Sequence, residues 1–384
     1  MEVVEIAERA RAEGRLGIDT EFMPEGRYRP LLCLVQIVVG EDITMLDPIA
    51  GPEFDPQPLA ECLADPSIEI VLHAGRQDVA LLRRCWSTDV TNVFDTQVAA
   101  GFAGFSAQAG YLGLLHDVLK IRLKKSASFT RWDQRPLTQE QLSYAAEDVE
   151  HLLPLADEIQ GRLSALERLE WAREECLSIA GATDERDADE VWRRLPRSSG
   201  LDPRERAIAR ELAAWRERTA EREDRPVGGV LRDPSVVELA KRAPRDRAAL
   251  GSIRGLTPDV GRRRGQEILD AIDRGREAEP IKLEREERLT SESGDGPVIA
   301  LAESLVRTRA LEAGLAYELI AARADLTPVV VAARRGLDPP AVRTLEGWRR
   351  ALVGDELLAL LGGERVLRVT DGRVDIRSKD PAAG

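Results

Sequence analysis

Two acidic residues, Asp19 and Glu21, lie two positions apart in the apolar segment LGIDTEF, residues 16–22. A short apolar segment of this kind predicts a β-strand, and side chains two apart in a strand lie on the same face. Two neighbouring carboxylates repel each other and are costly to bury unless a cation neutralises them. Oxygen ligands of this kind suit Mg²⁺ or Mn²⁺. Taken alone, the pair also fits a strand edge with solvated acids, which is the more common situation.

A third acidic residue, Asp78, follows a second predicted strand, EIVL at 69–72, in the segment HAGRQD. Gly75 permits a tight turn, and the helix expected next places Asp78 in its first turns, near the end of the strand. A carboxylate there also stabilises the helix dipole, so a purely structural role is an equal alternative. His73 is a candidate nucleic-acid contact, although a hydrogen-bonded loop histidine is the more common case.

A fourth acidic residue, Asp148, lies four positions after Tyr144. The helix expected here begins after Thr138, which has the capping-box spacing to Gln141. Residues four apart lie on one face of a helix, so Tyr144 and Asp148 are predicted to be neighbours. By itself such a pair is unremarkable.

The elements that must position these residues alternate along the first 165 residues. Apolar segments predict strands at 16–22, 31–39, 43–46 and 69–72. Helical patterns occupy 56–64, 76–85, 95–103, 111–119 and 139–162. This alternation predicts an α/β domain in which helices flank a mixed sheet.

The strand pattern ends after about residue 180, and the rest of the chain is predicted to be mainly helical. A polar linker precedes one helical block, and the polar segment TSESGDG at 290–296 precedes another. We therefore predict three domains, at 1–180, 201–282 and 297–365.

Together, D-x-E in a strand, H-x₄-D before a helix and Y-x₃-D in a late helix resemble the DEDD exonuclease superfamily, in the subgroup marked by the tyrosine. Longer segments resemble the ribonuclease D family: IDTEF (18–22), LVQI (34–37), LHAG (72–75), FDTQVAA (94–100) and RPLTQEQLSYAAEDV (135–149). This resemblance covers roughly residues 15–165 and implies a ribonuclease H-like fold. The block at 201–282 resembles the HRDC-type nucleic-acid-binding modules of that family, and the block at 297–365 resembles a divergent second copy.

The resemblance implies a 3′→5′ exoribonuclease in which two divalent ions, Mg²⁺ or Mn²⁺, catalyse hydrolysis of RNA 3′ ends and release nucleoside 5′-monophosphates. It implies that Asp19, Glu21, Asp78 and Asp148 bind the ions and that the hydroxyl of Tyr144 orients the attacking water. It also implies transfer RNA precursors with single-stranded 3′ ends as the substrate.

Two groups of basic residues are candidates for binding RNA. Lys124 and Lys125 precede Trp132, an arrangement in which basic groups meet phosphates and an aromatic ring stacks on a base. A solvated loop with one anchoring tryptophan is the alternative. Arg262, Arg263 and Arg264 are the best phosphate contacts in the helical blocks, although they also fit a charged helix surface balanced by acids.

Composition sets further bounds. The formal net charge is −13, with the acidic excess concentrated in residues 1–165, where a carboxylate site would raise it. No apolar segment approaches the roughly 20 residues of a membrane helix, and the cysteines form no CxxC pair, so we expect a cytoplasmic protein. A helicase is disfavoured because no GxxxxGK[ST] motif is present. A DNA-directed exonuclease of the same superfamily and an inactive RNA-binding scaffold remain as alternatives.

Overall fold

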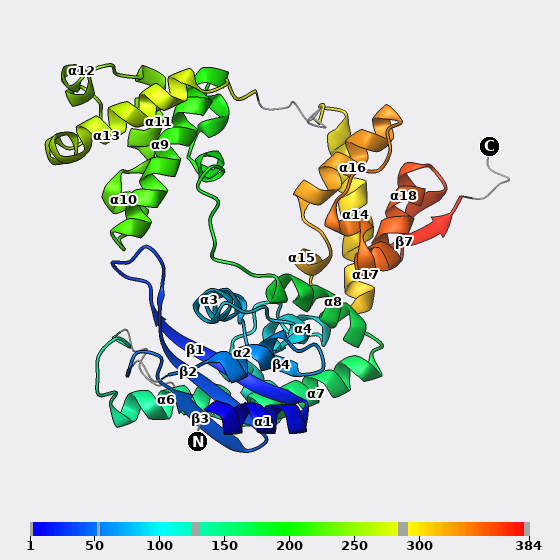
Figure 1. The fold of residues 1–384 in the computed structure, drawn as a ribbon. Coiled ribbons are helices and arrows are strands. Elements are labelled where there is room, and N and C mark those ends of the chain that lie inside the picture. The colour runs from blue at the N-terminus through cyan, green and yellow to red at the C-terminus, as the bar shows by residue number, and fades with distance from the viewer. Residues whose placement is uncertain (1–2, 52–53, 124–130, 283–290, 380–384) are drawn as a thin grey trace.

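The computed structural model describes residues 3–51, 54–123, 131–282 and 291–379. An α/β domain carries two helical blocks, one formed by residues 191–282 and the other by 291–379, which rise from the α/β domain in separate places (Figure 1). The candidate RNA contacts Lys124 and Lys125 lie outside the described residues.

The sheet of the α/β domain has five strands in the order β3-β2-β1-β4-β5. They are β1 (Arg15–Met23), β2 (Leu31–Val39), β3 (Asp42–Leu46), β4 (Glu69–Leu72) and β5 (Val93–Asp95). β1–β2 and β2–β3 are antiparallel, whereas β1–β4 and β4–β5 are parallel. The predicted mixed sheet flanked by helices is confirmed. β5 was not expected, because three residues are too few to show a strand pattern.

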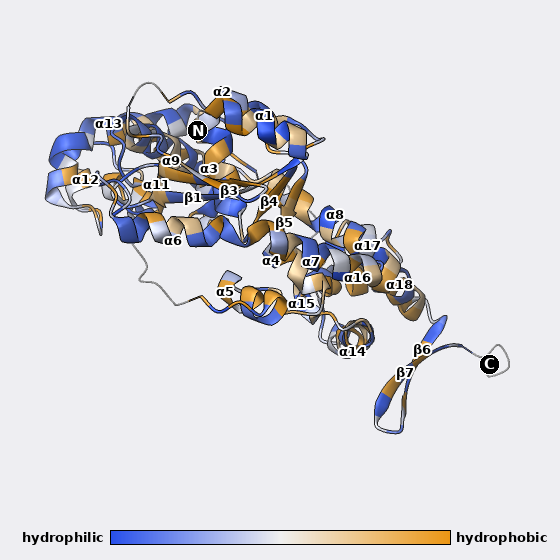
Figure 2. Ribbon diagram, turned by 90° about the horizontal axis from the view of Figure 1, so that it is seen from below, coloured by the Kyte–Doolittle hydropathy of each residue, from blue (hydrophilic) through white to orange (hydrophobic). Residues whose placement is uncertain are grey.

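Helices cover both faces of the sheet. One face packs on α1 (Val3–Glu13), α2 (Gln57–Ala64) and α3 (Arg76–Trp86). The other packs on α4 (Thr96–Phe102), α5 (Tyr111–Leu114), the π-helical turn η1 (Leu115–Leu119), α6 (Gln139–Glu150) and α7 (Leu152–Ala165). α8 (Leu169–Ala180) packs beside β5. Figure 2 shows the largely apolar strands between these helices.

The single helix expected at 139–162 is wrong, because the chain breaks at His151 into α6 and α7. Pro154 lies in the first turn of α7 and has no N–H to donate to the carbonyl of Glu150, so a continuous helix would lack that bond. The break lets α6 and α7 lie over different parts of the sheet.

The first helical block has a core of its own. It contains the short turns η2 (Val191–Arg194) and η3 (Ser198–Gly200), then α9 (Pro203–Arg222), α10 (Val227–Val230), α11 (Asp233–Arg242), α12 (Arg247–Gly251) and α13 (Pro258–Glu277). α9 and α13 cross closely at Gly275, where a Cβ atom would lie 2.4 Å from the Cα of Ile208. A side chain there would force the helices apart.

Polar contacts join this block to the α/β domain. The loop between β1 and β2 extends to α9 (Figure 1), where the Tyr28 hydroxyl donates to Glu217 at 3.0 Å and Arg27 donates to Asp224 at 2.7 Å. Arg84 of α3 pairs with Asp184 of the linker at 2.7 Å. The contact between the first helical block and the α/β domain is therefore mainly electrostatic.

The second helical block shares its core with the α/β domain. It contains α14 (Asp295–Ala313), α15 (Tyr317–Ile320), α16 (Arg323–Arg335), η4 (Arg343–Leu345), α17 (Gly347–Arg349), η5 (Arg350–Gly354), α18 (Asp355–Leu361) and a hairpin of β6 (Arg365–Thr370) and β7 (Arg373–Ser378). The Trp348 ring stacks on Trp171 at 5.4 Å and meets the edge of Phe102 at 5.0 Å. Since Phe102 and Trp171 belong to α4 and α8, one continuous apolar cluster joins the two parts.

Candidate active site

Strand β1 presents Asp19 and Glu21 to the side of the sheet covered by α6 and α7. Its alternate residue Ile18 is buried in the cluster on the opposite face, as the period of a strand requires. Gly17 lies beneath α7, where a Cβ atom would come 2.6 Å from Val38 and 3.2 Å from Leu152. The absence of a side chain at this position brings α7, and the end of α6 that precedes it, close to the strand.

Helix α6 adds Asp148 to this pair. One carboxylate oxygen from each of Asp19, Glu21 and Asp148 lies within 4.8 Å of the other two. The start of the helix is fixed by the predicted capping box: the Gln141 N–H donates to the Thr138 hydroxyl at 3.2 Å, and the Thr138 N–H donates to the Gln141 side chain at 3.0 Å. The three acids therefore lie close together in the folded protein.

Asp78 reaches the site from the first turn of α3, and its side chain is buried. The Thr20 hydroxyl donates to the Asp78 carboxylate, which ties α3 to the strand that carries Asp19 and Glu21. Asp78 is not one of the three acids whose oxygens lie within 4.8 Å. Its negative charge nevertheless helps to raise the pKa of both strand carboxyls, so it belongs to the same electrostatic site.

All four carboxyl groups have raised pKa values, and burial is the largest cause for each. Burial, together with the charges of Asp148 and Asp78, raises the pKa of Glu21 to about 8. The pKa of Asp148 rises to about 7, through burial and the charge of Glu147. The pKa of Asp19 rises well above its ordinary value for the same kinds of reason.

No lysine or arginine of the described residues forms an ion pair with any of these four acids. Clustered, half-buried carboxylates without a basic partner repel one another, and a divalent cation relieves both this repulsion and the cost of burial. The donor set consists of hard oxygen ligands, the kind that Mg²⁺ and Mn²⁺ prefer. The residues present thus fit a divalent metal site.

Tyr144 lies beside this acidic group. Its hydroxyl donates to the Asp148 carboxylate, and burial followed by the charge of Asp148 raises the pKa of the phenol. Its ring packs against Trp132, with 6.1 Å between the ring centroids. Trp132 is only 2% exposed, so the expectation that its ring stacks on a base is wrong. The tryptophan instead fills a small apolar cluster beneath α6.

Asp95 is a site-positioning residue that the sequence reasoning missed. Its fully buried carboxylate accepts hydrogen bonds from the backbone N–H groups of Ala74 (3.1 Å), Gly75 (2.8 Å), Gln97 (2.9 Å) and Val98 (3.2 Å). The first two fix the turn before Asp78, and the last two cap α4. The acid in the segment FDTQVAA was the available signal.

His73 and Tyr111 form the neighbouring wall of the site. The Thr96 hydroxyl donates to the Leu72 carbonyl at 3.0 Å, so it accepts from His73 Nδ1 at 2.9 Å, and this nitrogen carries the proton. Burial lowers the pKa of His73, which favours the neutral ring. The Tyr111 ring lies 5.4 Å from the histidine ring, and its phenol pKa is raised mainly by burial and also by the charges of Asp148 and Asp19. No sequence signal singled out Tyr111.

The three arginines of α13 have different surroundings. The side chains of Arg262 and Arg263 are 79% and 76% exposed, and each forms an ion pair with Asp259 of the same helix. Arg264, in contrast, donates to both carboxylate oxygens of Glu223, at 2.8 and 2.6 Å, at the end of α9. The expectation that Arg264 binds phosphate is therefore wrong, since its guanidinium holds two helices together.

Comparison with known proteins places this site in a family. A 3′-5′ exonuclease family model matches residues 1–164, and an HRDC domain model matches residues 205–272. Ribonuclease D of Gluconacetobacter diazotrophicus is 36% identical over 374 residues, which cover 96% of this chain and 93% of that protein. This chain belongs to the ribonuclease D family. Ribonuclease D of Acidiphilium cryptum is 34% identical, over 97% of this chain and 94% of that protein.

The fold agrees with this assignment to the ribonuclease D family. The crystal structure of Escherichia coli RNase D superimposes with a TM-score of 0.81 at 28% identity, over 94% of this chain and 96% of that one. The chain is thus a metal-dependent 3′→5′ exoribonuclease of the ribonuclease D type. None of the helices in the described parts of the chain is long and apolar enough to cross a bilayer.

Proposed function

We propose that Asp19, Glu21, Asp78 and Asp148 bind two divalent ions, Mg²⁺ or Mn²⁺, and that this site hydrolyses the terminal phosphodiester at RNA 3′ ends. The observation that carries the proposal is the group of carboxylate oxygens from Asp19, Glu21 and Asp148 within 4.8 Å of one another. Asp78 completes the set through its electrostatic coupling to the strand acids. Bound divalent ions supply Lewis acidity for phosphodiester hydrolysis.

The side chains around the ions have separate tasks in this proposal. The carboxylates are kept ionised by the cations and hold them on one side of the sheet. The Tyr144 phenol, whose pKa is raised, stays protonated near neutral pH, so it acts as a hydrogen-bond donor and not as a base. We assign it the task of orienting the attacking water, next to the Asp148 carboxylate that accepts its hydrogen bond. The products are nucleoside 5′-monophosphates.

We further propose precursors of transfer RNA with single-stranded 3′ ends as substrates and the cytoplasm as the place of the reaction. The Escherichia coli relative is described as an exoribonuclease involved in structured RNA processing, which supports a structured RNA with a free end. The proposed domain boundaries are 1–180, 201–282 and 297–365, and the HRDC match at 205–272 lies inside the second. Arg262 and Arg263 remain proposed phosphate contacts, together with Lys124 and Lys125. His73 remains a proposed nucleic-acid contact.

A time course on matched single-stranded RNA and DNA, each labelled at the 5′ end, tests this function. Reactions contain Mg²⁺, Mn²⁺ or EDTA, with Asp78→Asn as the inactive variant and Asp89→Asn, an exposed acid of the same domain, as the control. We expect a metal-dependent ladder that shortens from the 3′ end on RNA, absent in Asp78→Asn and present in Asp89→Asn. Cleavage mainly of DNA would overturn the substrate, and RNA binding without cleavage would favour a scaffold.

A further inference from the structure

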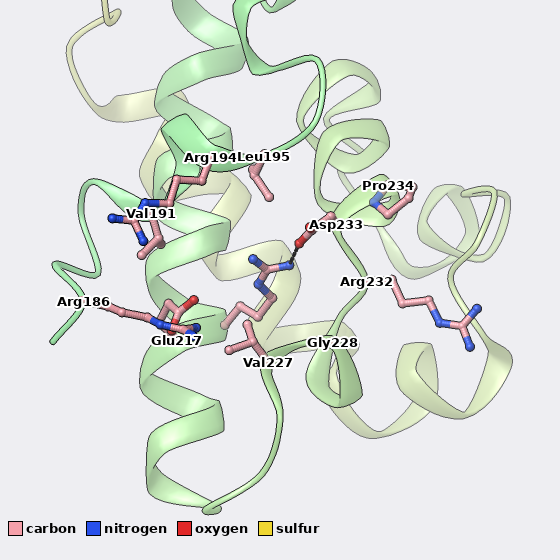
Figure 3. Close-up of a pocket in the computed structure, with 11 residues that line it drawn as sticks. Arg186, Val191, Arg194, Leu195, Glu217, Val227, Gly228, Arg232, Asp233 and Pro234 are labelled. Carbon is pink, nitrogen blue, oxygen red and sulfur yellow. Dashed lines mark hydrogen bonds and ion pairs between the residues drawn. The ribbon is translucent and has the colours of Figure 1, made fainter. Parts of the chain in front are cut away.

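A cavity of about 500 Å³ lies in the first helical block, far along the chain from the carboxylates. We call it the arginine pocket, after the four arginines among its lining residues: Arg186, Arg194, Arg216 and Arg232. The linker and η2 form one side, the middle of α9 forms the floor, and the start of α11 forms the other side (Figure 3).

The lining carries excess positive charge. The acids that line the pocket are Glu217 and Asp233, so the four arginines leave a formal charge of +2. Arg186 lies 3.8 Å from Glu217, and Arg216 lies 2.6 Å from Asp233. Arg194 and Arg232 are exposed and form no ion pair with any of the described residues. Two cationic side chains at the rim are thus available to an anion.

The floor contains an unsatisfied donor. Arg216 is only 5% exposed, and one of its terminal nitrogens donates to the Leu231 carbonyl at 3.0 Å and to Asp233. Its Nε–H is buried without a hydrogen-bond partner among the described residues. The guanidinium at the floor therefore keeps an unsatisfied donor, which is costly for a charged group, and an anion beside this buried cation would be favourable. The N-terminus of α11, a ten-residue helix, adds a favourable dipole.

The cationic groups are spread around the pocket and do not converge on one point. Arg194 extends to one side, Arg232 points outward on the other, and Glu217 lies between the linker and the floor (Figure 3). The two rim arginines lie on opposite sides of the pocket (Figure 3), an arrangement suited to an extended chain of phosphates that meets one after the other. The arrangement therefore favours a polynucleotide backbone over a mononucleotide.

The pocket also borders the nuclease domain. Glu217, which lines it, accepts a hydrogen bond at 3.0 Å from the hydroxyl of Tyr28. Tyr28 lies in the loop that follows β1, the strand of Asp19 and Glu21. A chain of RNA that lies across the pocket is consequently next to the loop that leads to the metal-binding strand.

We propose that the arginine pocket binds backbone phosphates of the RNA substrate upstream of its 3′ end, with Arg194 and Arg232 at the rim and Arg216 at the floor. This inference rests on the proposed RNA substrate and assigns part of its binding to a defined cavity. The contacts are to phosphates and involve no base edge, so binding in the pocket should not depend on the base sequence.

The test compares the full-length double variant Arg194→Ala/Arg232→Ala with a matched control, Arg218→Ala/Arg247→Ala. The control removes two exposed arginines of the same block that form no ion pair with any described residue and do not line the pocket. Binding of a 5′-fluorescent 20-nucleotide oligoadenylate is measured in EDTA by anisotropy at several salt concentrations. Because EDTA prevents metal-dependent cleavage, a failure of the proposed hydrolysis would not affect this readout.

We expect the pocket variant to lower the slope of log Kd against log salt by about 1 to 1.5, since each phosphate contact on a single strand contributes roughly 0.7. The control should change the slope by less than half as much. Equal slopes in the two variants would overturn the proposal. Calorimetry with adenosine 5′-monophosphate separates the two sources of phosphate: binding that needs Arg194 and Arg232, with unchanged oligoadenylate affinity, would instead make the pocket a nucleotide site. Circular dichroism verifies that both variants are folded.

Discussion

The substitution Asp95→Asn should disturb both the stability of the domain and the position of Asp78. In the native protein one carboxylate oxygen accepts from Ala74, Gln97 and Val98, and the other accepts from Gly75 at 2.8 Å. An asparagine can keep its oxygen toward the first three donors. Its NH₂ group then faces the N–H of Gly75, so two donors meet in a buried place.

The magnitude follows from these contacts. An unsatisfied buried N–H costs about 1–3 kcal/mol, and hydrogen bonds to a charged acceptor contribute roughly twice as much as those to a neutral one. We therefore expect the free energy of unfolding to fall by about 3 kcal/mol. Gly75 is the residue before α3, and Asp78 lies three positions later. The displaced turn should lower apparent metal affinity by about 10- to 100-fold, the range for residues that support metal ligands.

Urea unfolding, with the metal-dependent rate on labelled RNA, measures both effects. Asp65→Asn is the matched control, because that partly exposed aspartate also accepts a backbone N–H, from Ser67 at 2.9 Å, but lies away from the site. A loss of stability below 0.5 kcal/mol for Asp95→Asn, with unchanged metal dependence, would refute the positioning role; such a small effect is typical of a surface substitution.

Three other outcomes are expected. Tyr144→Phe should lower the rate of RNA hydrolysis by about 10- to 100-fold with little change in RNA affinity. This loss is smaller than that for a general acid or base because the phenol only orients water. An unchanged single-turnover rate would contradict this role. In EDTA, the melting temperature should rise as the pH falls from 9 to 6, because the raised pKa values of Glu21 (about 8) and Asp148 (about 7) make the folded state bind more protons than the unfolded state there. Glu21→Gln should weaken that dependence, and a melting temperature that rises with pH would be inconsistent with the shifts. Trp348→Ala should lower the free energy of unfolding by about 3–5 kcal/mol. The loss should destabilise the α/β domain together with the second helical block, and faster hydrogen exchange in α4 and α8 would detect it. Unchanged protection in these helices would show that the two parts unfold separately.

The shared core also bears on truncation. Removal of residues 291–379 would expose Phe102 and Trp171, which pack against Trp348. The first helical block, in contrast, has its own core and meets the α/β domain through polar side chains. Loss of RNA affinity on deleting everything after residue 200 would thus combine lost contacts with lost stability, so point variants of exposed arginines are the cleaner test.

The sequence by itself determined the candidate acids and the elements that carry them. Asp19 and Glu21 share a face because a strand has a period of two, and Tyr144 and Asp148 share a face because a helix brings residues four apart together. The capping box at Thr138 and Gln141 is also a local feature, and it is present as predicted. Such features depend on neighbours within a few positions, so the order of residues is sufficient to predict them.

Contacts between distant segments were decided only by the tertiary structure. Asp95 supports Asp78 across 17 positions of the chain, and Thr20 binds Asp78 from another element. Trp132 and Arg264 were candidate RNA contacts from the sequence. In the folded protein the Trp132 ring packs against Tyr144, and the Arg264 guanidinium donates to Glu223. Whether an aromatic or a cationic side chain faces solvent depends on which elements pack over it, and this packing is a property of the whole fold. The arginine pocket could not be predicted from the sequence for the same reason. Its residues come from the linker, α9 and α11 and meet only when the block folds.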